Sequence, residues 1–213
     1  MNNIRVCLLD FDGTLVTDDI LGLLCGLVGK QEESQKINDA FIRGELEPLS
    51  SLVERINLIT GITRFQIMDL LSKNNYLMPG ANELIQFLKG NKIITILASG
   101  NILSVLEYYQ KLLGIDYIVG SNPDILKEKI VGITEFSYSG PQFKIDGIKK
   151  IIDPMKLEKE NIIAIGDSPA DKGMFELSGF SIAFNPKGNI ADFADIVIKD
   201  DLSRIINILQ NKN

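Results

Sequence analysis

Cys7-Leu8-Leu9-Asp10-Phe11-Asp12-Gly13-Thr14 lies near the start of the 213-residue chain. An apolar run over residues 4–9, interrupted only by Arg5, ends here in two aspartates separated by one residue. Short apolar runs bounded by turn residues are typical of buried strands in parallel sheets. Because ligands of open α/β sheets bind at the carboxyl ends of such strands, Asp10 and Asp12 are candidate functional residues. Taken alone, the stretch is equally compatible with a plain strand followed by an Asp-Gly turn.

Composition excludes several classes of protein. The net charge of -6 and the pI near 4.8 disfavour nucleic acid and anionic membranes as partners. The chain has no histidine, which removes histidine-based triads, histidine general bases and histidine-ligated zinc. Its two cysteines, Cys7 and Cys25, lie in apolar stretches without metal-binding spacing, so we expect reduced interior thiols. We find no signal peptide or membrane span in the sequence and expect a cytoplasmic protein.

A helical insert is predicted directly after the first strand. Apolar residues between residues 18 and 78 fall at helical spacing, and Thr63 is a candidate helix cap. We therefore predict a core domain of residues 1–16 and 79–213 and a small all-helical cap of residues 17–78. An insert at this point would lie over the ligand-binding edge of the sheet, where lids are found.

Two later apolar runs, at residues 93–98 and 162–165, also end in polar residues. The first continues into Ser99-Gly100-Asn101, and the second into Gly166-Asp167. Strands that alternate with helices predict a doubly wound, mostly parallel (Rossmann-like) α/β sheet. The remaining predicted helices are at 83–89 with Asn82 as cap, at 102–113, at 144–152, through 174–177 and at 202–209. We also predict short strands at 117–119, 181–184 and 196–198 and an irregular hairpin at 129–136.

Four aspartates are thus expected at one edge of the sheet: Asp10, Asp12, Asp167 and Asp171. Such a group needs a cation, and carboxylate oxygens without histidine or a thiolate pair favour Mg²⁺. Aspartate is also a known covalent nucleophile that forms an aspartyl-phosphate. The combination predicts phosphoryl transfer.

The polar groups resemble, in order, the four motifs of haloacid dehalogenase superfamily phosphatases. Residues 10–14, 98–100, 144 and 166–171 correspond to these motifs. The resemblance implies that Asp10 is the nucleophile and that Asp12 is a general acid that later acts as base. It also implies that Ser99 and the Gly100 amide bind phosphate, that Lys144 neutralises charge, and that Asp171 orients this lysine or a metal-bound water. The implied Mg²⁺ ligands are Asp10, the Asp12 carbonyl and Asp167. The structural alternatives are a helix cap for Ser99 and an exposed helix lysine for Lys144.

The insert resembles the small cap of the subfamily that contains phosphoserine phosphatase. The resemblance implies that Asp19 binds a substrate ammonium and Arg55 a substrate carboxylate, and that Ile42 and Leu49 face the site. The alternative for Arg55 is an exposed arginine or one paired with Glu54 or Asp69. Three residues depart from the pattern of that subfamily: Asp19 replaces a glutamate, Asn101, a candidate substrate-binding residue, replaces a glycine, and Ala170 replaces an asparagine.

The implied function is a Mg²⁺-dependent phosphomonoesterase that acts on a small phosphorylated metabolite, with O-phosphoserine as the expected substrate. The alternatives are a phosphatase for a sugar, enol or nucleotide phosphate, a phosphotransferase, and a non-catalytic protein that binds a phosphorylated ligand. The sequence leaves the oligomeric state open.

Overall fold

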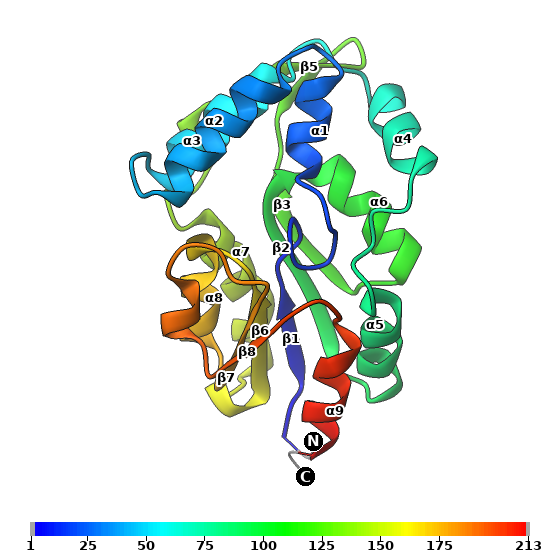
Figure 1. Cartoon of the computed structure of the whole chain (residues 1–213), viewed down its shortest axis with the longest axis vertical. Helices are drawn as coiled ribbons and strands as arrows, with labels where there is room; N and C mark the ends of the chain where they lie inside the picture. Colours follow the sequence, from blue (N-terminus) through cyan, green and yellow to red (C-terminus); the bar gives the residue numbers. More distant parts are fainter. Residues whose placement is uncertain (1–2, 212–213) are drawn as a thin grey trace.

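The computed structural model describes residues 3–211. Its centre is a six-stranded sheet with the order β3-β2-β1-β6-β7-β8, in which each neighbouring pair is parallel (Figure 1). The strands are β1 (Val6–Leu9), β2 (Ile94–Ile102), β3 (Tyr117–Ser121), β6 (Ile162–Gly166), β7 (Phe180–Phe184) and β8 (Ile196–Ile198). The predicted doubly wound α/β core is confirmed.

Side chains of β1 alternate between two buried layers. Cys7 and Leu9 pack on the face covered by α5 (Ala81–Gly90), α6 (Leu103–Leu113) and α9 (Ser203–Asn211). Val6 and Leu8 pack on the face covered by α7 (Phe143–Ile152) and α8 (Lys172–Leu177). Because both faces are covered, β1 is apolar on both sides, as its unbroken run of hydrophobic residues predicts.

The order of the strands changes direction at β1: β2 and β3 lie on one side of it, and β6, β7 and β8 lie on the other. Leu9 is aligned with Leu97 of β2 and with Ile165 of β6. The residues that follow these three positions therefore lie side by side towards the carboxyl edge of the sheet. This is the topological switch point at which open α/β sheets bind ligands.

The insert is helical, as predicted, and contains α1 (Ile20–Gly26), α2 (Gln31–Ile42), α3 (Pro48–Leu58) and α4 (Arg64–Lys73). The first three helices pack together, whereas α4 lies against α6 of the core (Figure 1). Thr63 caps α4, since its side chain accepts a hydrogen bond from the Gln66 amide. The hairpin of β4 (Asp124–Leu126) and β5 (Lys129–Gly132) joins the insert, where Ile130 exchanges backbone hydrogen bonds with residues 61 and 62. The division into two domains remains a prediction.

Two predicted details of the core are wrong. Asn82 does not cap α5; the N-cap is Gly80 at φ +79°, where a Cβ atom would lie 2.3 Å from the backbone nitrogen of Ser203. The hairpin spans residues 124–132 and not 129–136, because Lys127 and Glu128 adopt left-handed conformations that form its turn.

The predicted strand at 93–98 continues as β2 through the Ser-Gly-Asn segment to Ile102. The helix that follows begins at Leu103, so Ser99 is neither a helix cap nor part of a helix N-terminus. Short 3-10 helices complete the chain at η1 (Glu135–Ser137), η2 (Asp153–Met155), η3 (Lys159–Asn161), η4 (Pro169–Asp171) and η5 (Ile190–Phe193). Within residues 3–211, no helix has the length and apolar character needed to cross a membrane.

Candidate active site

Lys144 joins two aspartates at the carboxyl edge of the sheet. Its ammonium donates to Asp10 Oδ1 at 2.8 Å and to Asp171 Oδ1 at 2.6 Å, and all three residues are buried. Burial opposes the charge of the lysine, but the two carboxylates raise its pKa above the ordinary value. Lys144 is therefore a buried cation between two acids and not an exposed helix lysine.

The turn after β6 fixes the other oxygen of Asp171. Asp171 Oδ2 accepts hydrogen bonds from the backbone amides of Asp167 and Ser168, both at 3.0 Å. A Cβ atom on Gly166 would lie 2.5 Å from the Asp171 side chain, so only glycine permits this close approach. The Gly-Asp-Ser-Pro-Ala-Asp segment thus positions Asp171 to hold Lys144.

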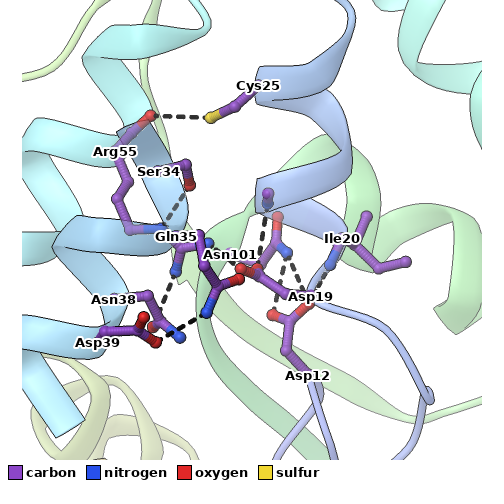
Figure 2. A network of polar contacts seen from close by, with 11 residues as sticks. Asp12, Asp19, Ile20, Cys25, Ser34, Gln35, Asn38, Asp39, Arg55 and Asn101 are labelled. Carbon is purple, nitrogen blue, oxygen red and sulfur yellow. Dashed lines mark hydrogen bonds and ion pairs between the residues drawn. The ribbon is translucent and has the colours of Figure 1, made fainter. Parts of the chain in front are cut away.

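Asp12 has a separate set of partners. Its Oδ1 accepts from the backbone amide of Ile20 at 2.8 Å, and its Oδ2 accepts from Asn101 Nδ2 at 3.0 Å (Figure 2). The Asn101 carbonyl accepts from the Ile102 amide at 2.8 Å, so both ends of this carboxamide are engaged. Burial and the negative charge of Asp19 raise the pKa of Asp12 to about 7. The substrate-binding role predicted for Asn101 remains a prediction, and its present contacts orient Asp12.

Three carboxylates converge at the sheet edge. Asp10, Asp167 and Asp171 each offer an oxygen atom within 4.8 Å of the others. Burial and neighbouring negative charge, above all that of Asp171, raise the pKa of Asp10 to about 8 and that of Asp167 to about 7. These buried carboxyls thus resist being ionised together, and a cation among them would favour their charged forms.

Lys187 also lies at this edge and is not among the site residues predicted from the sequence. Its ammonium is 2.7 Å from Asp167 Oδ2, and its backbone amide donates to the Asp167 carbonyl at 2.6 Å. Burial lowers the pKa of Lys187, and the charge of Asp167 outweighs this effect and raises it. The signal was available: Asn185-Pro186-Lys187 follows β7, so it leaves the sheet at the same edge as the other site residues.

Core and insert enclose a cavity of about 570 Å³ above these groups. Ser99 and Gly100 line it from the core, and Ile42 and Leu49 line it from the insert, as predicted. The insert comes close to the core here, since a Cβ atom on Gly100 would lie 3.1 Å from the side chain of Leu52. Nearly the whole predicted set lines this cavity: Asp10, Asp12, Asp19, Arg55, Ser99, Gly100, Asn101, Lys144 and Asp167.

Arg55 reaches the cavity from α3 and pairs with Asp19 at the start of α1 (Figure 2). Arg55 is buried, so the alternative of an exposed arginine or one paired with Glu54 or Asp69 is wrong. Asp19 also caps α1, since its Oδ1 accepts from the Gly22 amide at 3.1 Å. A positive and a negative group therefore lie side by side where the insert lines the cavity, and Asp19 is close enough to Asp12 to raise its pKa.

The fold and the site define a class: doubly wound α/β proteins with aspartates at the ends of the central strands, an arrangement suited to phosphoryl transfer. The family model of haloacid dehalogenase-like hydrolases matches residues 7–176. The chain belongs to this family.

Proteins named phosphoserine phosphatase match nearly all of the chain. It is 31% identical over 212 residues to phosphoserine phosphatase of Campylobacter jejuni subsp. doylei, covering 97% of this chain and 100% of the relative. It is 28% identical over 207 residues to phosphoserine phosphatase of Archaeoglobus fulgidus, and spans only 60% of that longer protein. A solved structure of a phospho-aspartyl intermediate analogue of phosphoserine phosphatase superposes with a TM-score of 0.86 at 27% identity, covering 97% of this chain and 99% of that one.

Proposed function

We propose that the chain is a phosphoserine phosphatase, which hydrolyses O-phosphoserine through a phosphorylated Asp10. The observation that carries the proposal is the cavity itself. The core lines it with Asp10 and Lys144, and the insert lines it with Arg55 and Asp19. The first pair suits a phosphoryl group, and the second suits the carboxylate and ammonium of an amino acid. The relatives named above support the same substrate.

The chain's own residues can carry both half-reactions. A carboxylate oxygen of Asp10 attacks phosphorus, and the bond from phosphorus to the serine oxygen breaks as Asp12 donates a proton to that oxygen. Asp12 then takes a proton from water, whose oxygen attacks phosphorus and releases inorganic phosphate, which restores Asp10. A general acid and base works best with a pKa near the operating pH, and the Asp12 pKa of about 7 meets this condition.

Ser99, Gly100 and Lys144 are proposed to bind the phosphoryl group. The Ser99 hydroxyl accepts from the Asn101 amide at 3.0 Å, which leaves its own proton free to donate. Lys144 would offset the negative charge of both nucleophile and phosphate. We also propose that residues 17–78 act as a cap that excludes water from this site.

The aspartate cluster fits a bound Mg²⁺. All of its donors are carboxylate oxygens, and burial and mutual repulsion raise the pKa values of Asp10 and Asp167, an effect that a bound cation would oppose. Asp10, Asp167 and the backbone carbonyl of Asp12 would hold the ion. When bound, Mg²⁺ would neutralise charge on the phosphoryl oxygens.

We expect Mg²⁺ to raise the melting temperature of the protein, and to do so more at pH 8 than at pH 5. Protons compete with the metal for the Asp10 and Asp167 carboxyls, whose pKa values are about 8 and 7. Thermal unfolding with Mg²⁺ or with a chelator, across this pH range, measures the effect. Loss of a residue that only orients a metal ligand typically weakens metal binding roughly 10- to 100-fold. Asp167 is proposed to bind the ion directly, so Asp167→Asn should weaken Mg²⁺ binding by at least this factor. A Mg²⁺ shift that is equal at both pH values, or unchanged in this variant, would contradict the proposed site.

The substrate proposal is tested with Arg55→Ala. We expect kcat/KM for O-phosphoserine to fall by roughly 10- to 100-fold, the value of a charge-assisted hydrogen bond. Phosphoethanolamine lacks the carboxylate, so its kcat/KM should change little. A panel that includes sugar, enol and nucleotide phosphates completes the experiment. Preference of the wild type for one of these, or loss of Arg55 without effect on O-phosphoserine, would refute the substrate assignment.

A further inference from the structure

Two uncharged side chains of α2 hold the guanidinium of Arg55. Ser34 Oγ accepts from Arg55 Nε at 2.9 Å, and Asn38 Oδ1 accepts from Nη1 at 3.3 Å (Figure 2). The third contact, from Nη2, goes to Asp19. Ser34 and Asn38 are one helical turn apart, so they face Arg55 from the same side of α2.

The burial of Ser34 indicates that this contact is built into the insert. Ser34 is 0% exposed and is the one buried residue along α2, all of which the structure describes. The buried position of an amphipathic helix is ordinarily apolar, and a buried hydroxyl is costly unless it is hydrogen-bonded. Here the hydroxyl meets the guanidinium of Arg55, a residue that is itself only 9% exposed.

The partners of Arg55 differ in charge. Ser34 and Asn38 are neutral, so they fix the plane of the guanidinium without neutralising it. Asp19 is anionic and half-buried, and its cap contact with Gly22 keeps it in place. An amino-acid ligand could therefore exchange with the Asp19 contact at Nη2 while the contacts to α2 persist. Such preorganisation lowers the entropic cost of binding.

We propose that Ser34 and Asn38 are positioning residues that set the specificity of the cavity for a phosphate ester carrying a carboxylate. The proposal rests on the proposed function. In this arrangement α2 holds Arg55 in the orientation that meets the carboxylate. Selectivity then depends on two neutral side chains as well as on the charged pair.

The experiment compares Ser34→Ala, Asn38→Ala and the double variant with the wild type. Gln35→Ala is the matched control, because Gln35 lies between the two residues on α2, is exposed, and contacts Asp39 and not Arg55. KM and kcat are measured for O-phosphoserine and for phosphoethanolamine. The variants should raise KM for O-phosphoserine about tenfold each, the value of one hydrogen bond to a charged group, with kcat nearly unchanged. Phosphoethanolamine kinetics, and both substrates with the control, should stay within about twofold.

The outcomes separate this inference from the proposed function. Equal kcat/KM of the wild type for the two substrates would overturn the proposed function and this inference with it. A wild-type preference for O-phosphoserine that both single variants retain would overturn the inference alone. Asn38 is partly exposed, so Asn38→Ala supplies the test even where Ser34→Ala does not fold.

Discussion

Replacing Asp10 with asparagine is expected to abolish turnover, with kcat lower by roughly 10⁴-fold or more, as for other lost covalent nucleophiles. The amide has nearly the same shape as the carboxylate but is not a nucleophile towards phosphorus. It also removes one negative charge from the cluster that Asp10 forms with Asp167 and Asp171. The folded protein should therefore survive while the first half-reaction is lost.

Two measurements check this result. Steady-state phosphate release gives kcat, and acid quenching with radiolabelled O-phosphoserine detects the phosphorylated protein. Asp18→Asn makes the same chemical change at an exposed aspartate outside the cavity and should leave both readouts unchanged. Label retained on the Asp10→Asn variant, or turnover near the wild-type rate, would exclude Asp10 as the nucleophile.

The core of the site could be predicted because its residues follow buried strands. Parallel strands bring their carboxyl ends to one edge, so the order of apolar runs and polar residues along the chain determines which side chains meet. Asp10, Ser99 and Asp167 come together for this reason. The register of β1 with both neighbours places them there.

The parts that sequence reasoning missed depend on pairing in three dimensions. Ser34 and Asn38 look like ordinary polar positions of an amphipathic helix until Arg55 of α3 is placed beside them. The extension of β2 through residues 99–102 depends on Ser121 of β3, whose hydroxyl donates to the Gly100 carbonyl at 2.6 Å. Local sequence favours a turn at Ser-Gly-Asn, and contacts with a later strand override it.

Lys144→Met is expected to remove both activity and stability, because it leaves two buried carboxylates without their cation. Loss of one partner of a buried ion pair costs about 3–5 kcal/mol of unfolding free energy. Lys144 lowers the pKa of Asp10, so in the variant this pKa should rise above its present value of about 8. The ionised form of the nucleophile would then be rarer still at neutral pH, and the phosphoryl group would lose the cation that offsets its charge, so kcat should fall by several orders of magnitude.

The pH dependence of the stability loss identifies its cause. A carboxyl whose pKa is raised in the folded state costs nothing below its unfolded pKa of about 4, where it is protonated in both states. Between pH 4 and about 8 the unfolded state ionises while Asp10 stays largely protonated in both folded proteins, so Asp10 adds little to the difference between variant and wild type. Above about pH 8, Asp10 of the folded wild type ionises beside Lys144 and that of the folded variant does not, so the deficit of the variant grows. Urea unfolding should therefore show a deficit against wild type that changes little below about pH 8 and increases above it. Lys150→Met, an exposed lysine on the same helix, should show no deficit in either pH range. A deficit independent of pH would point to lost packing of the lysine stem instead of an uncompensated charge on Asp10.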